Sequence, residues 1–91
     1  MEDGDFEWDD AKAASNWLKH GIDFLMAREV FQDIFAIEWM DHGHGDLEDR
    51  LVTVGMAENR LLCVVHTMRG GKIRIISARL TESHVKTEIS Q

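Results

Sequence analysis

The stretch Ile73-Arg74-Ile75-Ile76-Ser77-Ala78-Arg79 is rich in β-branched residues, which is typical of a strand in a sheet. Strict alternation along such a strand puts Arg74 and Arg79 on opposite faces. A buried guanidinium needs an anionic partner. We therefore consider three interpretations of these arginines: an internal ion pair with Glu38 or Glu48, a side chain that extends to solvent at the sheet edge, and a rigidly held ligand for phosphate. Because opposite faces cannot serve one site, Arg79 is the preferred phosphate ligand and Arg74 a structural or partner-facing residue.

The segments before this strand predict more strands joined by tight turns. Arg69-Gly70-Gly71-Lys72 is typical of a hairpin turn, because glycine adopts the positive φ angles that such a turn requires. Residues 61–65 are apolar throughout and predict a central strand covered on both faces. Further strands are expected at 52–56 and at 35–40, where Phe35, Ile37 and Trp39 alternate with other residues and should form a buried face. Short connections of this kind predict an antiparallel sheet of about four to five strands.

The N-terminal half predicts helices. After a short strand at residues 6–8, an aspartate cap at position 9 or 10 and a terminating Gly21 delimit a first helix, with Ala11, Ala14 and Leu18 on one apolar face. Asp23 then caps a second helix that ends near residue 33. A short C-terminal helix is expected over residues 81–91. The predicted fold class is α+β, with two N-terminal helices packed on the antiparallel sheet.

Length and composition indicate the general class of protein. The chain has 91 residues, so a single domain over residues 1–91 is expected. Hydrophobic residues make up 44% and charged residues 30%, and no apolar run approaches the ~18 residues that would span a bilayer. The acidic start is unlike a secretory signal, and Cys63, the one cysteine, cannot form an internal disulfide. We therefore expect a cytoplasmic protein without a membrane partner.

The charge is distributed unevenly along the chain. The net charge is −7, but residues 1–49 carry 14 acidic and three basic residues, whereas residues 50–91 carry seven basic and three acidic residues. An acidic chain argues against a nucleic-acid ligand, although local potential matters more than the total charge. The acidic half either keeps the protein soluble or faces a partner different from that of the basic half.

Other residues could carry acid–base or metal chemistry. Lys19 and His20 end the first helix, where cations are favoured by the helix dipole but could also bind an anion or transfer a proton. Glu48 and Arg50 belong either to a surface charge cluster or to a site in which the carboxylate orients a base or pairs with Arg79.

The stretch His42-Gly43-His44-Gly45-Asp46 superficially resembles a metal-binding loop. Because a zinc site needs three or four ligands, usually from several segments, a polar loop is the preferred interpretation. Cys63 is expected in the core, and the three tryptophans in the core or an interface, although one could stack on a base.

The ordered set of motifs resembles the BrnT toxin family over residues 6–81. The matching residues are Phe6-Glu7-Trp8-Asp9, Lys12, Asn16, Lys19-His20-Gly21-Ile22-Asp23-Phe24, Ala27, Val30-Phe31, Asp33, Glu48-Asp49-Arg50, Gly55, Val64-Val65, Arg69 and Ile73 to Arg79. The resemblance implies a RelE-like α+β fold and ribonuclease activity within a type II toxin–antitoxin system. It also implies neutralisation by a BrnA-type antitoxin, in a heterotetramer with an antitoxin dimer, and contact with operator DNA through the antitoxin alone.

Carried over by position, the resemblance implies catalytic roles for Lys19, Glu48, Arg69 and Arg79. The expected reaction needs no metal or other cofactor: the ribose 2′-hydroxyl attacks the adjacent phosphate. The resulting cleavage of RNA would inhibit translation. Arg69 and Arg79 would stabilise charge, Lys19 would assist proton transfer or bind phosphate, and Glu48 would be the base or its orienter. Arg50, His20 and Arg74 are the weaker, RNA-binding candidates.

Two features leave other functions open: the C-terminal residues and the acidic net charge of −7. The C-terminal residues 81–91 lack the Glu-Arg pair and the following Tyr that are usual in the final helix of the family. The first alternative is thus a catalytically impaired homologue that still binds an antitoxin. The second is a metal-dependent hydrolase that uses His42, His44 and Asp46.

Overall fold

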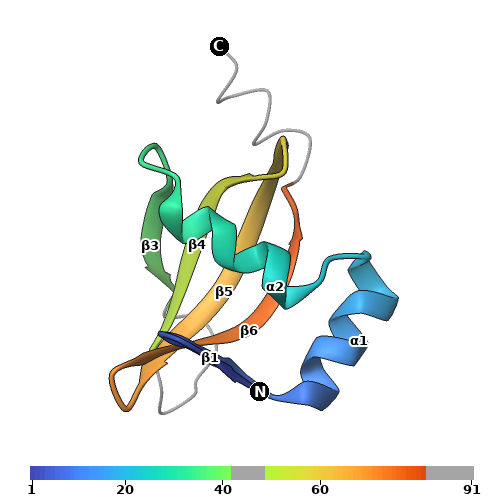
Figure 1. Ribbon diagram of the computed structural model, residues 1–91. Coiled ribbons are helices and arrows are strands. Elements are labelled where there is room, and N and C mark those ends of the chain that lie inside the picture. The colour runs from blue at the N-terminus through green and yellow to red at the C-terminus, as the bar shows by residue number, and fades with distance from the viewer. Residues whose placement is uncertain (42–48, 82–91) are drawn as a thin grey trace.

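The computed structural model describes residues 1–41 and 49–81 and contains one sheet with helices on one side and at one edge (Figure 1). The strand order is β1-β2-β6-β5-β4-β3. The elements are β1 Glu2–Asp3, β2 Phe6–Trp8, α1 Asp10–His20, α2 Phe24–Ala27, the 3-10 helix η1 Arg28–Gln32, β3 Ile37–Asp41, β4 Arg50–Ala57, β5 Arg60–Arg69 and β6 Lys72–Leu80.

The predicted hairpins are confirmed. Strands β3 to β6 pair antiparallel in sequence order, with β5 inside the sheet. Glu58 and Asn59 both have positive φ, 48° and 64°, in the β4–β5 turn, and Gly70 and Gly71 have φ of 59° and 80° in the β5–β6 turn. Two successive residues with positive φ match the right-handed twist of the strands, so these turns set the register of the sheet.

The predicted fold class is wrong in its sheet and in its helices. The sheet has six strands and is mixed, because β2 lies parallel to β6, with Phe6 opposite Ile73 and Trp8 opposite Ile75. The short β1 then pairs with β2. The physical cause is the free edge that β6 presents after pairing with β5: Phe6 and Trp8 bury their rings by filling it.

The second helix is much shorter than expected. Asp23 caps it as predicted, through a bond from Met26 N to Asp23 Oδ1 of 3.1 Å, but the α-helix ends after Ala27 and continues as the 3-10 helix η1. A 3-10 helix is tighter than an α-helix, and η1 packs closely on β4. A Cβ on Gly55 would lie 3.0 Å from the carbonyl oxygen of Val30. The predicted C-terminal helix lies outside the described residues.

The first helix has the predicted ends but buries a different side. Asp9 accepts bonds from the amides of Ala11 and Lys12, and Gly21 is the left-handed cap. The expected apolar face of Ala11, Ala14 and Leu18 is exposed, whereas Asn16 is buried against β6. Helix α1 is therefore held to the sheet partly by a polar side chain.

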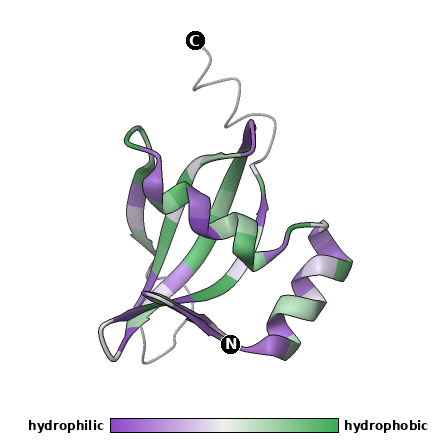
Figure 2. Cartoon of the chain, in the orientation of Figure 1, coloured by the Kyte–Doolittle hydropathy of each residue, from purple (hydrophilic) through white to green (hydrophobic). Residues whose placement is uncertain are grey.

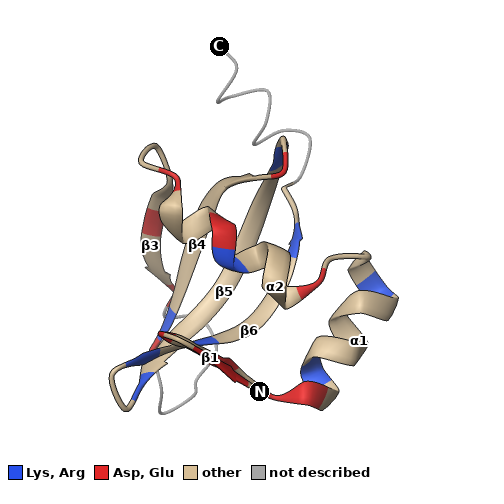
Figure 3. Cartoon of the chain, in the orientation of Figure 1, with Lys and Arg blue, Asp and Glu red and all other residues tan. Residues whose placement is uncertain are grey.

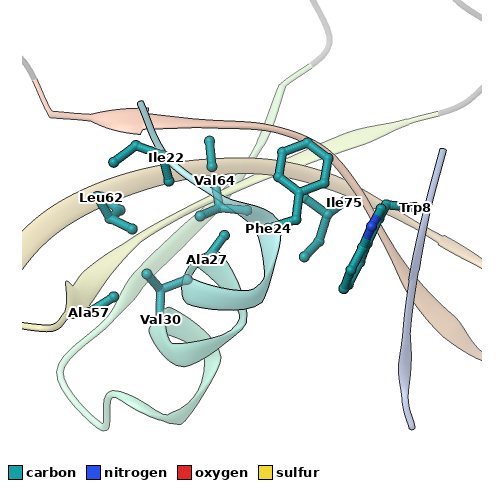
Figure 4. Close-up of a cluster of buried hydrophobic side chains, with 10 residues drawn as sticks. Trp8, Ile22, Phe24, Ala27, Val30, Ala57, Leu62, Val64 and Ile75 are labelled. Atoms are coloured by element: carbon teal, nitrogen blue, oxygen red, sulfur yellow. The ribbon is translucent and has the colours of Figure 1, made fainter. Parts of the chain in front are cut away.

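The main hydrophobic core lies between α2, η1 and the sheet (Figure 4). Green apolar segments run through the central strands in the hydropathy colouring (Figure 2). The buried members of the main core are Trp8, Ile22, Phe24, Ala27, Val30, Ala57, Leu62, Val64, Ile75 and Ala78. A second buried cluster, Val52, Val54 and Cys63, lies on the opposite face, so the expected core position of Cys63 is confirmed. Strand β5 thus contributes to both clusters.

A bulge in β6 overturns the predicted faces of the two arginines. Val65 is opposite Ser77 but His66 is opposite Ile75, so Ile76 is an extra residue in β6. An extra residue reverses the alternation of side chains beyond it. Arg74 and Arg79 therefore lie on the same face of the sheet, the face opposite α2 and η1.

Candidate functional site

We call the face of the sheet opposite α2 and η1 the open face. The strand register places charged, polar and apolar side chains on this face. They are Ile37, Trp39 and Asp41 from β3, Arg50, Val52 and Val54 from β4, Cys63, Val65, Thr67 and Arg69 from β5, and Lys72, Arg74, Ser77 and Arg79 from β6. Its centre is the apolar cluster of Val52, Val54 and Cys63. Its cations lie near the strand ends, and basic segments are seen around the β5–β6 turn (Figure 3).

Two of these cations form ion pairs with the N-terminal strands. Arg74 Nη1 lies 2.5 Å from Glu7 Oε2, directly across the parallel β2–β6 pair. Lys72 pairs with Glu2 of β1, and this contact raises the pKa of Lys72 and lowers that of Glu2. Arg74 thus has an internal ion pair, but with Glu7 and not with Glu38; the other expected partner, Glu48, lies outside the described residues. Arg50 and Arg69 also interact with neighbouring groups.

Arg79 differs from these residues. It is exposed, and in the described parts of the chain no carboxylate is bonded to its guanidinium. Its neighbour Ala78 is completely buried and is fixed to α1 by the side chain of Asn16. A guanidinium on so well anchored a backbone is suited to binding a phosphate oxygen.

Asn16 has a structural role that the sequence did not predict. Its Nδ2 donates to the carbonyl oxygens of Ala78 (2.8 Å) and Ile22 (3.0 Å), and its Oδ1 accepts from Ala78 N (3.0 Å). Strand β2 pairs with β6 only as far as Ile75. The carboxamide therefore replaces the missing strand neighbour at Ala78, because a carboxamide offers the same donor and acceptor as a peptide group. We call this arrangement the Asn16 clamp.

The Asn16 clamp joins the two elements that carry Lys19 and Arg79. Lys19 follows Asn16 by one turn of α1, and Arg79 follows Ala78 in β6. Lys19 and His20 are both exposed at the C-terminal end of α1, where the helix dipole favours cations.

The structure does not bring all the predicted catalytic residues together. Arg79 is opposite Cys63, whereas Arg69 lies six residues further along β5, which corresponds to roughly 20 Å of strand. One phosphate is therefore not held by both arginines. Arg50 and Arg74 lie towards the Arg69 end of the sheet. Glu48 lies outside the described residues.

The sequence also gave no indication of a buried polar cluster under η1. His66 Nε2 lies 2.8 Å from Thr53 Oγ1, which donates to Glu38 Oε1 at 3.0 Å. Burial lowers the pKa of His66, while the charge of Glu38 opposes this shift. His66 Nδ1 is buried and has no partner in the described part of the chain. With 2% of its surface exposed, His66 cannot reach a substrate, so the cluster is structural.

Residues 1–41 and 49–81 contain no group of three or more His, Cys, Asp or Glu side chains placed to hold a metal ion. The candidate metal ligands His42, His44 and Asp46 lie outside those ranges. Among the described residues, no helix has the length and apolar character to cross a membrane.

The fold and the open face define a class: a small protein with one mixed sheet, whose open face carries arginines, one of them exposed and without an acidic partner among the described residues. The family model described as "Ribonuclease toxin, BrnT, of type II toxin-antitoxin system" matches residues 8–84. The chain belongs to this family of ribonuclease toxins, whose members act with an antitoxin partner. No curated protein matches the chain.

Proposed function

We propose that this chain is an endoribonuclease toxin that cleaves RNA without a metal ion, in the cytoplasm. The observation that carries the proposal is Arg79, an exposed guanidinium without an acidic partner in the described residues, on a backbone fixed by the Asn16 clamp. Family membership supplies the reaction class, ribonuclease.

In the proposed reaction, the 2′-hydroxyl oxygen forms a bond to the adjacent phosphorus while the bond from phosphorus to the 5′-oxygen breaks. The hydroxyl proton goes to a base, and a proton is delivered to the leaving 5′-oxygen, which leaves a 2′,3′-cyclic phosphate and a 5′-hydroxyl. Arg79 stabilises the charge that develops on the phosphate, and Lys19 binds the phosphate or transfers a proton. Glu48, as base or orienter, remains a prediction from the family resemblance.

Because Arg69 and Arg79 lie far apart on the open face, the remaining cations have a different role in this proposal. Arg69, roughly 20 Å from Arg79 along the strand, binds a flanking part of the RNA together with Arg50 and Arg74. His20 contributes to RNA binding beside Lys19. Substitutions at the scissile phosphate should then lower kcat, whereas substitutions in the flanking group should mainly raise KM.

The partner is proposed to be a BrnA-type antitoxin. A heterotetramer with an antitoxin dimer, which contacts operator DNA through the antitoxin alone, would place the toxin away from DNA. This agrees with the net charge of −7, which does not favour direct DNA binding.

Cleavage of a labelled RNA by the purified chain tests the proposal. Arg79→Ala should lower kcat about 100-fold or more, the usual loss when one donor to a developing oxyanion is removed. Arg60→Ala is the matched control, since Arg60 is an exposed arginine at the start of β5. Lys19→Ala is compared with Lys12→Ala, an exposed lysine at the other end of α1. Full activity in both Arg79→Ala and Lys19→Ala would overturn the site.

Two further outcomes separate the alternative functions. Cleavage that EDTA abolishes would contradict the metal-free reaction and favour His42, His44 and Asp46. A wild-type chain that neither cleaves RNA nor arrests bacterial growth, yet binds the antitoxin, would identify an impaired homologue that keeps only the binding function.

A further inference from the structure

Strand β3 forms one border of the sheet, and β4 is its partner in the described residues. An outer strand leaves a row of backbone amides and carbonyls able to pair with another chain. Proteins usually protect such an edge with lysine, proline, a bulge or a covering segment. Residues 34–41, Ile-Phe-Ala-Ile-Glu-Trp-Met-Asp, contain neither lysine nor proline.

The side chains at this border are apolar and exposed, although a buried face was expected from their alternation. Ile34 is 89% and Phe35 83% exposed, and Ile37, Trp39 and Met40 are each about half exposed. We call these five residues the β3 edge surface. Several adjacent exposed apolar residues, rather than one alone, are typical of a protein interaction site.

The backbone that presents Ile34 and Phe35 is held in place. Asp33 accepts bonds from Phe35 N at 2.9 Å and from Met56 N at 2.8 Å, and these bonds lower the pKa of Asp33. The turn is thereby fixed to β4. Its two apolar side chains thus point outward on an ordered turn, a pre-organised arrangement that reduces the entropy cost of binding.

Charge and alternation indicate what would bind there. Residues 29–41 contain four acidic residues (Glu29, Asp33, Glu38 and Asp41) and no lysine or arginine. A second copy of this chain would bring the same acidic segment and be repelled. Along β3, Ile37, Trp39 and Asp41 lie on the open face, and Glu38 and Met40 lie on the opposite face. Each face of β3 therefore has both apolar and acidic side chains, and a complementary strand carries apolar residues together with lysine or arginine.

We propose that an extended apolar and basic segment of the antitoxin adds to β3 as a further strand of the sheet. This inference rests on membership of a toxin–antitoxin family, not on the proposed cleavage chemistry. Three strand spacings separate β3 from β6, which is roughly 14 Å. Substitutions at the β3 edge surface should therefore alter antitoxin binding without altering the site around Arg79.

The test measures binding of the antitoxin, taken as the product of the gene next to that of this chain, by titration calorimetry. The double variant Ile34→Ser/Phe35→Ser should bind at least tenfold more weakly. Leu18→Ser, at an equally exposed position on α1 (84%), is the matched control and should bind like the wild type. Because the substituted side chains are exposed, thermal unfolding should show that both variants fold.

Hydrogen exchange of the wild-type complex gives an independent measurement. The amides of residues 37–41 should exchange more slowly when the antitoxin is bound. Unchanged affinity in the double variant, or unchanged exchange in β3, would overturn the inference. Sedimentation showing a dimer of the toxin alone that the double variant abolishes would also overturn it, in favour of a second copy. A chain that binds the antitoxin in this way without cleaving RNA would contradict the proposed function and leave the docking surface in place.

Discussion

Replacing Asn16 with alanine should destabilise the protein more than any exposed substitution, because the Asn16 clamp is buried at both ends. Asn16 is 5% exposed, and it bonds to backbone groups of Ile22 and Ala78, which are both completely buried. Removing the carboxamide leaves two carbonyl oxygens and one amide without their partner. Each buried group that loses its partner costs about 1–3 kcal/mol, so the expected loss is at least about 3 kcal/mol.

This loss is large for a domain of this size. A stability of about 0.05–0.15 kcal/mol per residue gives 91 residues a free energy of unfolding of roughly 5–14 kcal/mol. Each kcal/mol shifts Tm by about 4–8 °C in domains of up to 100 residues. Asn16→Ala should therefore lower Tm by at least about 12 °C.

Urea unfolding followed by circular dichroism measures the change, and two further variants identify its cause. Asn16→Asp has almost the same volume but replaces the Nδ2 donor by an oxygen that faces two carbonyl oxygens, so it should be at least as destabilising. Ser15→Ala, exposed on the same helix, should stay within about 0.5 kcal/mol of the wild type. Losses below about 1 kcal/mol in both Asn16 variants would refute the clamp.

Three further predictions concern other parts of the fold. Gly55→Ala should cost about 1–3 kcal/mol in urea unfolding, because its Cβ would lie 3.0 Å from Val30 O and 3.2 Å from Ala36 Cβ; an unchanged midpoint would contradict the close packing of η1 on β4. The pKa of His66 is lowered in the folded state. The stability that its neutral form contributes is therefore fully present above the unfolded pKa of ~6.5 and is lost as pH falls below that value. Unfolding free energies at pH 7.5 and pH 5 should consequently differ less in His66→Phe than in the wild type. Glu7→Gln removes the charge that compensates Arg74, so RNA affinity at low salt should rise and its salt dependence steepen by up to about one unit; equal affinity and slope would show that RNA does not contact Arg74.

The parts of the fold that were predicted correctly depend on local sequence. Gly70-Gly71 determines a turn through its own backbone angles, and the apolar run at residues 61–65 predicts an inner strand whatever its partners are. Asp9, Gly21 and Asp23 delimit helices through bonds to residues only a few positions away. These signals need no knowledge of distant parts of the chain.

The parts that were predicted wrongly depend on distant partners. The parallel pairing of β2 with β6 joins residues more than sixty positions apart, and no pattern within residues 6–8 indicates a parallel or antiparallel neighbour. The bulge at Ile76 inserts one residue among several similar ones, yet it moves Arg74 to the face of Arg79. Periodicity also favoured the wrong side of α1, because the residue that anchors that helix is the polar Asn16.

The same reasoning explains what could be predicted of the site. An arginine within an apolar strand was expected to need an anionic partner, and this holds for Arg74, which pairs with Glu7, but not for Arg79, which is exposed. Which partner each one finds was not predictable: Arg74 pairs with Glu7 only because β2 lies beside it. The partner of each arginine and the grouping of the cations along the sheet thus depend on the register of distant strands.

The parallel pair between β2 and β6 also affects how the protein is made. A ribosome adds about 5–20 residues per second, and β2 must wait for β6, which is the last described strand to leave the ribosome. Until then Phe6 and Trp8 have no sheet edge to cover, and both Arg79 and the backbone of Ala78 that Asn16 binds are missing. A nascent chain that ends before β6 consequently lacks both the β2–β6 pair and Arg79, the proposed phosphate ligand. Any cleavage activity that depends on Arg79 therefore begins only after synthesis is nearly complete.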